Sequence, residues 1–206
     1  MSERALEGVK VLDLTHHISG PYCTKLLADF GAEVLKVERP GGDPTRRRAP
    51  FLNDDVDSEK SLVFAYLNTN KQSVTLNLKT EKGIQVLKSL IEHTDVVVEN
   101  FAPRVMASLG LDFESLQKIN PSLVLTSISN FGQTGPYRDY KAADIIEYAM
   151  GGLMYISGGY DREPLKHAFN QAQFKAGTDG AGATLMAMYH QRLTGEGQHV
   201  DISIQE

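Results

Sequence analysis

Residues 9–38 read VKVLDLTHHISGPYCTKLLADFGAEVLKVE, and their pattern decides the fold class. The β-branched, apolar runs Val9–Leu14 and Glu33–Glu38 each predict a strand. Between them, apolar residues recur at the three- and four-residue spacing that is typical of the buried face of a helix. These residues are Cys23, Leu26, Leu27 and Phe30. A strand, a helix and a second strand in this order predict two parallel strands joined by a crossover helix.

The same alternation continues along the chain and predicts an α/β sheet with parallel strands. Further strands are predicted at Ser73–Leu78, Val96–Val98, Leu123–Ser129 and His199–Ile204. Helices are predicted after Thr80, near Val105–Leu109 and Phe113–Ile119, from Asp144 to Gly151, and at Lys175–Arg192. Thr80 and Asp144 are residue types that favour the N-cap position, so we expect each to begin its helix.

Composition limits the class of protein. The chain has 206 residues, 41% of them hydrophobic and 23% charged, which is typical of a globular protein and excludes a disordered, fibrous or membrane-spanning one. A net charge of −5 argues against nucleic-acid binding, which usually needs a basic excess. Cys23 is the one cysteine, and the N-terminus lacks an apolar leader, so we expect a cytoplasmic protein without disulfides.

Several familiar site patterns are missing. The segment His16–Pro21 after the first strand lacks the G-x-G-x-x-G pattern, so we expect neither NAD nor FAD to bind. His16 and His17 would point to opposite faces of an extended segment, and the other histidines have no ligand spacing, so we predict no metal. There is no G-x-S-x-G elbow, and Cys23 on a buried helix face should be inert.

Two segments that follow predicted strands could hold an anion. Thr45–Arg48, together with Lys36 and Arg39, places cations on the carboxyl side of the second strand, where open α/β sheets bind ligands. The alternative for this run is a solvated charged surface. The segment Asn100–Arg104 also follows a core strand directly, and its alternative is a simple helix start. The residues alone therefore indicate an α/β domain that binds a phosphorylated ligand.

Many segments, in order, resemble the family III CoA-transferases, which include formyl-CoA, carnitine and benzylsuccinate CoA-transferases and the related α-methylacyl-CoA racemases. The matching segments are Leu6–Leu14, Gly20-Pro21, Leu27–Arg39, Gly42-Asp43, Asn68–Ser73, Val98–Phe101, Leu109–Leu111, Phe131–Pro136 and Thr194–Gln198. The resemblance implies a Rossmann-like, mostly parallel sheet flanked by helices, coenzyme A or acyl-CoA as substrate, and an intertwined dimer. It also implies that residues 1–206 are the N-terminal part of the CoA-binding large domain, without the smaller domain and the returning C-terminal segment. We therefore expect exposed apolar surface and a homologous partner chain.

The resemblance also assigns site residues by position. The implied contacts to CoA are Ile18, Ser19, Arg39, Leu76, Asn77, Leu78, Lys79, Asn100, Phe101, Ala102 and Lys141. A gap-free match from Asn70 to Thr194 places Gln173 where the family has its nucleophilic aspartate. A carboxamide is neutral and a poor nucleophile. Ser108 replaces a frequent arginine, Ile18 replaces the glutamine of formyl-CoA transferase, and Ala143 replaces the histidine of the racemases.

Three hypotheses follow from Gln173. The first is a CoA-transferase subunit that transfers CoA between an acyl-CoA and a carboxylic acid, with the aspartate supplied by a homologous chain. The second is an active enzyme that uses another carboxylate, for which the candidates are Asp179, Asp144 and Glu147. Against these candidates, Asp144 is expected to be an N-cap and Glu147 to face solvent. The third is a subunit that binds acyl-CoA without catalysis.

Overall fold

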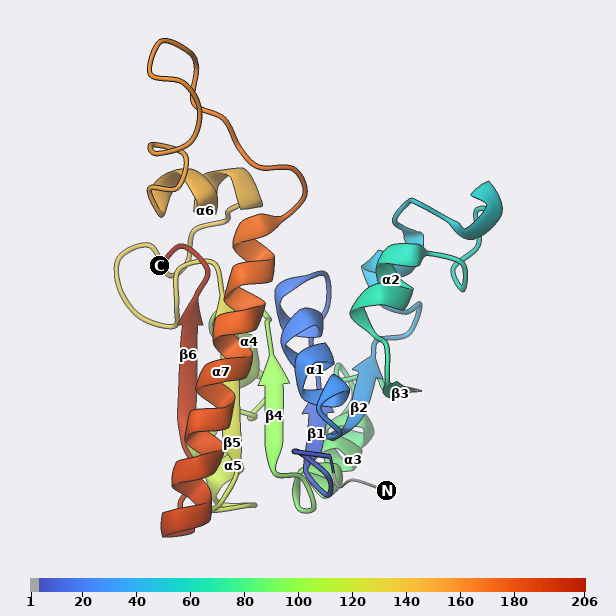
Figure 1. The fold of residues 1–206 in the computed structure, drawn as a ribbon. Coiled ribbons are helices and arrows are strands. Elements are labelled where there is room, and N and C mark those ends of the chain that lie inside the picture. The colour runs from blue at the N-terminus through green and yellow to red at the C-terminus, as the bar shows by residue number, and fades with distance from the viewer. Residues whose placement is uncertain (1–3) are drawn as a thin grey trace.

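The computed structural model describes residues 4–206 as one six-stranded, all-parallel sheet flanked by helices (Figure 1). The strands are β1 Lys10–Asp13, β2 Glu33–Glu38, β3 Lys71–Thr75, β4 Val96–Glu99, β5 Val124–Ser129 and β6 His199–Ser203. Their order across the sheet is β3-β2-β1-β4-β5-β6. This order is that of the Rossmann fold, so the predicted α/β class is confirmed.

Helices cover both faces of the sheet, as Figure 1 shows. They are α1 Ser19–Asp29, α2 Leu62–Leu67, α3 Glu81–Ile91, α4 Val105–Ser108, α5 Phe113–Gln117, α6 Asp144–Met150 and α7 Gln171–Thr194. On one face, α1 and α7 pack over residues such as Val11 and Val98. On the other face, α3, α4 and α5 pack over Leu12 and Val97. Alternate residues of each central strand therefore enter opposite cores, as the period of two in a strand requires.

Local signals explain where most elements begin. The predicted N-cap at Thr80 is confirmed, because its hydroxyl accepts a hydrogen bond from Gly83 N at 3.1 Å. The predicted N-cap at Asp144 is wrong. Ala143 is the N-cap of α6, and the Asp144 carboxylate instead accepts from Gln173 N at 3.3 Å and pairs with Lys166 at 2.6 Å. Asp144 therefore joins α6 to α7 rather than capping its own helix.

The segment from residue 40 to residue 78 differs most from the sequence prediction. β3 ends at Thr75, so the Leu76–Leu78 part of the predicted strand continues beyond the sheet. The connection between β2 and α2 contains the two short 3-10 helices Pro44–Arg47 and Leu52–Asp54. The short helix α2 was not predicted, and the Ser61 hydroxyl begins it by accepting from Phe64 N at 3.3 Å. Within residues 4–206, no helix has the length and apolar character needed to cross a membrane.

Glycines let α7 lie close to α1. A Cβ atom at Gly177 would lie 2.6 Å from Ser19 O and 3.1 Å from Tyr22 Cβ. Ser19 and Tyr22 belong to the first turn of α1. The contact therefore needs the absence of a side chain at this position.

Replacing Gly177 by alanine is expected to lower the free energy of unfolding by about 1–3 kcal/mol, because the added methyl group overpacks the α1–α7 contact. The matched control is Gly182→Ala on the same helix, where an added Cβ would meet no atom within 4 Å. That control should raise the free energy of unfolding by roughly 0.5–1 kcal/mol through helix propensity. Urea-induced unfolding measures both changes, and equal effects of the two substitutions would contradict the proposed close contact.

Candidate functional site

Two adjacent cavities open near the carboxyl ends of β1, β2 and β4. Their volumes are about 710 Å³ and 920 Å³, and both are lined by His16 and Phe101, whose ring centroids lie 5.9 Å apart. These two residues follow β1 and β4, between which the strand order reverses. Ligands of open α/β sheets bind at such a switch point.

The expected CoA contacts are distributed between the two cavities. Those that line the first cavity are Arg39, Leu76, Asn77, Leu78, Lys79 and Phe101. Those that line the second are Ile18, Ser19, Asn100, Phe101, Ala102 and Lys141, and Gln173 lines it too. The fold therefore brings residues that are far apart in the sequence to one pair of cavities. That they contact CoA stays a prediction.

Asn100 joins the two loops that separate the cavities. Its Oδ1 accepts from His16 N at 2.9 Å, and its Nδ2 donates to His16 O at 2.7 Å. The side-chain amide thereby matches both backbone groups of one residue. The Asn100 carboxamide therefore holds the β1 loop in place, and its expected contact with CoA stays a prediction.

The His16-His17 segment was expected to be extended, but it is not. His17 has φ 63°, and the two imidazole rings lie 5.0 Å apart. Burial lowers the pKa of His16 to about 4, and His17 and nearby cations act in the same direction, so the His16 ring is neutral at physiological pH. In the described part of the chain, no cluster of three or more His, Cys, Asp or Glu side chains could hold a metal ion.

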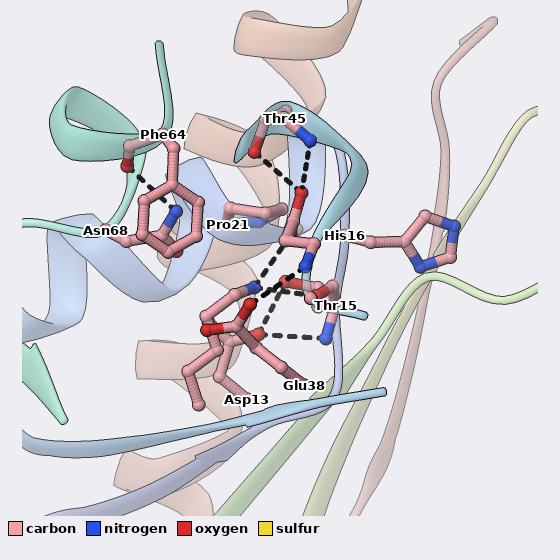
Figure 2. A network of polar contacts seen from close by, with 12 residues as sticks. Asp13, Thr15, His16, Pro21, Glu38, Thr45, Phe64 and Asn68 are labelled. Atoms are coloured by element: carbon pink, nitrogen blue, oxygen red, sulfur yellow. Dashed lines mark hydrogen bonds and ion pairs between the residues drawn. The ribbon is translucent and has the colours of Figure 1, made fainter. Parts of the chain in front are cut away.

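A buried network of charges supports the β1 loop (Figure 2). Asp13 Oδ2 accepts from Thr24 Oγ1 at 2.7 Å and from Lys71 Nζ at 2.9 Å. Asp13 Oδ1 accepts from Thr15 N at 2.9 Å. Burial opposes ionisation of Asp13, but Lys36 and Lys71 hold its pKa well below the ordinary value. The Asp13–Lys71 pair therefore anchors the start of the loop that carries His16.

Two of the cations that were expected to bind a phosphate form ion pairs within the protein instead. Lys36 is buried, and its Nζ donates to Thr15 O at 2.8 Å and lies 3.0 Å from Asp43 Oδ2. Arg46 binds Glu38 through two hydrogen bonds of 2.8 Å each. Burial opposes ionisation of Glu38, but bonds from Arg46, Ser73 and the backbone lower its pKa to about 2. Neither acidic partner, Asp43 or Glu38, was predicted from the sequence.

The remaining arginines of that segment line the cavities. Arg39 and Arg47 line the first cavity, and Lys79 joins them there. Arg48 lines the second cavity and donates to Asn170 Oδ1 at 2.9 Å. Positive charge is therefore present at both cavities, although it comes from fewer residues than expected.

Gln173 in the second cavity contacts a buried carboxylate. Its Nε2 donates to Glu147 Oε2 at 2.7 Å. Glu147 was expected to face solvent, but only 1% of it is exposed. Burial raises the pKa of Glu147 to about 7, the bond from Gln173 opposes this rise, and the charge of Asp144 adds to it. Asp144 and Glu147 are three residues apart and share one helix face, which was the available signal that both point inward.

Two further residues of the site were not predicted. With its carboxamide oriented to satisfy both neighbours, Asn130 donates to Glu147 Oε1 at 3.0 Å and accepts from Ala142 N at 3.0 Å. Glu99, at the end of β4, is buried and accepts from Phe101 N at 2.8 Å, so it shapes the loop that carries Phe101. Burial raises the pKa of Glu99 to about 7 against its hydrogen bonds. The role of Asn130 depends on a tertiary contact with Glu147, which the sequence does not show.

Known proteins resemble this chain in sequence and structure. The sequence model of CoA-transferase family III matches residues 6–206. The formyl-CoA:oxalate CoA-transferase of Streptomyces avermitilis is 44% identical over 202 residues, which are 98% of this chain and 48% of that protein. The succinate–glutarate CoA-transferase of Agrobacterium fabrum is 40% identical over 202 residues, which are 97% of this chain and 50% of that protein.

A solved structure gives the same result. The crystal structure of a CAIB/BAIF family protein from Brucella suis superposes with a TM-score of 0.93 at 38% sequence identity. The match covers 99% of this chain and 54% of that one. The chain spans about half the length of the curated relatives that it matches.

Proposed function

The chain belongs to CoA-transferase family III, and on this premise we propose that it binds an acyl-CoA across the two cavities and takes part in CoA transfer to a carboxylic acid. The observation that carries the proposal is the placement of the expected CoA contacts. Every one of them lines one of the two cavities that meet at His16 and Phe101. A long ligand such as CoA could follow the carboxyl ends of the strands from one cavity to the other.

The first cavity suits the nucleotide end of CoA. Arg39, Arg47 and Lys79 supply cations for phosphate groups. Its wall also contains apolar side chains that could cover a base, namely Leu14, Val37, Leu76, Leu78, Val105 and Leu109. The acidic net charge of the chain is compatible with this assignment, because the cations are concentrated at one site.

The second cavity suits the thioester end of the ligand. Gln173 lines this cavity. The sequence resemblance assigns it to the position of the family's aspartate, and a carboxamide does not attack a thioester. The nucleophilic carboxylate therefore comes either from a homologous partner chain that retains the aspartate or from another acidic residue of this chain. The alternative function is an acyl-CoA-binding subunit without catalysis.

Exposed apolar side chains on α7 support the proposal of a partner chain. Met186, Tyr189 and Leu193 recur on one side of the helix and are each about two-thirds exposed, at 70%, 68% and 69%. A homologous CoA-transferase chain in a homo- or hetero-oligomer would cover such a surface. Light scattering tests this part of the proposal, and a monodisperse, stable monomer would contradict it.

Arg39→Ala and Lys79→Ala are each expected to weaken CoA binding by about tenfold or more, because each removes a charge-assisted hydrogen bond to phosphate. Isothermal titration calorimetry with free CoA measures the affinities. The matched control is Lys118→Ala, an exposed lysine after α5 that lines neither cavity, and it should leave the affinity unchanged. Absence of CoA binding by the unmodified chain would contradict the proposed function.

A transfer assay distinguishes the possible sources of the carboxylate. The chain is incubated with succinyl-CoA and glutarate, alone and together with an aspartate-retaining homologue. Turnover only in the mixture supports a partner's aspartate, and turnover by the chain alone supports an internal carboxylate. CoA binding without turnover in either case supports the non-catalytic subunit.

A further inference from the structure

Glu147 is a buried carboxylate one side chain away from the second cavity. Its Oε2 accepts from Gln173 Nε2 at 2.7 Å, and its Oε1 accepts from Asn130 at 3.0 Å. Gln173 and Asn130 both line the cavity, whereas Glu147 lies behind them. The two amide donors therefore hold a carboxylate next to the position where the family has its reactive one.

A purely structural role does not explain this arrangement. Within residues 4–206, no lysine, arginine or histidine lies within ion-pair distance of Glu147, and the neighbouring Lys166 is paired with Asp144. Burying a carboxylate without a cation is costly, and a glutamine at this position would keep the fold without that cost. An ionisable group that is buried at such a cost beside a cavity is a candidate for a functional role. Its raised pKa of about 7 leaves a substantial ionised fraction at neutral pH.

The other two candidate carboxylates are less suitable. Asp144 lines the second cavity, but it is held by the Lys166 ammonium and by Gln173 N, which reduces the nucleophilicity of its oxygens. Asp179 pairs with Lys175 on the exposed side of α7 and lines neither cavity. Glu147 is therefore the candidate that combines burial beside the cavity with the absence of a cationic partner among the described residues.

We propose that Glu147 is the carboxylate that accepts the acyl group in this chain, with the carboxamide of Gln173 as a hydrogen-bond donor beside it. The inference rests on the proposed function, because it requires the thioester of an acyl-CoA in the second cavity. It places the nucleophile on α6 instead of α7, across one hydrogen bond from the family position.

Two bond exchanges transfer CoA from the donor acid to Glu147. A Glu147 oxygen attacks the thioester carbonyl carbon, a C–O bond forms, the C–S bond breaks, and CoA leaves as a thiolate. The product is an anhydride between the acyl group and Glu147. The thiolate then attacks the Glu147 carboxyl carbon, the donor acid leaves as a carboxylate, and a glutamyl-CoA thioester remains.

The acceptor acid reverses these exchanges. Its carboxylate attacks the glutamyl carbon and releases the CoA thiolate, which gives a second anhydride. The thiolate attacks the acceptor carbonyl carbon, so that acceptor-CoA is released and Glu147 is regenerated as a carboxylate. The cycle consumes one acyl-CoA and one acid, produces one of each, and needs no redox partner.

Access to Glu147 requires Gln173 to turn aside, because Glu147 is only 1% exposed. A Gln173 side chain that turns toward the cavity carries its N–H groups with it. Those groups could then donate to the oxyanion that develops on the thioester carbonyl. Asn130 would continue to bind the second oxygen of Glu147. Glu147 would thus carry out the nucleophilic attack, and Gln173 would stabilise the developing charge.

The test maps the covalent intermediate. The full chain is incubated with succinyl-CoA and then treated with sodium borohydride, which reduces a glutamyl-CoA thioester to an alcohol, and peptides are analysed by mass spectrometry. We expect the reduced residue to be Glu147. Glu147→Gln should lower the modification to background, whereas the matched variant Asp179→Asn should retain it. Gln173→Leu should slow its formation by about 10²–10³-fold, as expected for loss of one oxyanion donor.

Calorimetry with free CoA separates failure of this inference from failure of the proposed function. If the unmodified chain and Glu147→Gln both bind CoA but no modification appears at Glu147, the inference is wrong and CoA binding stands. Modification of another acidic residue would overturn the inference in the same way. If the unmodified chain does not bind CoA, both proposals fail. The site is mapped in the unmodified chain, so the result does not depend on the folding of any variant.

Discussion

Replacing Lys71 by methionine is expected to lower the free energy of unfolding by about 3–5 kcal/mol, because the buried Asp13 carboxylate loses the ammonium that is hydrogen-bonded to it. Lys71 Nζ lies 2.9 Å from Asp13 Oδ2, and both side chains are at most 1% exposed. The same ammonium also donates to Pro21 O at 2.8 Å and to Asn68 Oδ1 at 3.0 Å. The substitution therefore removes three contacts of one buried group.

Urea-induced unfolding measures this effect, and two variants serve as controls. The double variant Asp13→Asn/Lys71→Met should lose less stability than Lys71→Met alone, since no buried charge is left unpaired. Lys175→Met removes the exposed pair with Asp179 and should cost about 0.5 kcal/mol or less. Exposed ion pairs contribute at most about 1 kcal/mol. If Lys71→Met lowers the free energy of unfolding by less than this, the proposed contribution of the buried pair is wrong.

The same pair predicts a pH dependence of stability. The folded state holds the pKa of Asp13 below its ordinary value. As the pH falls, Asp13 is therefore protonated in the unfolded chain before it is protonated in the folded one. The contribution of the pair is therefore fully present above about pH 4 and is lost at lower pH. Asp13→Asn should remove this part of the acid sensitivity.

Replacing Asn100 by leucine is expected to weaken CoA binding by about 10–100-fold. The change removes two hydrogen bonds to His16, each of about 1–1.5 kcal/mol, and thereby releases the loop between the cavities. Asn100→Asp should also weaken binding, because one carboxylate oxygen still accepts from His16 N but the other is repelled by His16 O. Calorimetry with free CoA measures the affinities.

The unfolding free energy serves as the control for these variants. If Asn100→Leu lowers stability but leaves the CoA affinity unchanged, Asn100 supports the fold and does not position the binding loops. That result would contradict the role that the geometry indicates.

Strong local patterns predicted much of the fold. The bounds of β2 were predicted correctly because an apolar, β-branched run is followed by a turn at Pro40–Gly42. The cap of α3 was predicted because Thr80 acts on its own helix. The six-residue helix α2 was missed because it is too short for a periodic pattern, and because the complete burial of Leu67 is a tertiary effect.

The errors at the site have the same physical cause. Lys36 and Arg46 were expected to be available to an anion. The sequence does not show that the folded loop brings Asp43 and Glu38 close to them. Glu147 was placed in solvent because the sequence does not show that α7 and Asn130 cover that face of α6. The family resemblance supplied positions for the CoA contacts, but the sequence did not show that Asn100 holds a loop.

The close contact of α1 and α7 has a consequence for the width of the site. Gly177 lies four residues after Gln173, which is about one helical turn, and it rests against Ser19 at the start of α1. Ser19 and Gln173 both line the second cavity, so the hydrogen atom at Gly177 acts as the spacer between two of its walls. A larger residue there would move the walls apart. Residue size at position 177 thereby controls the width of the second cavity, although Gly177 does not line it.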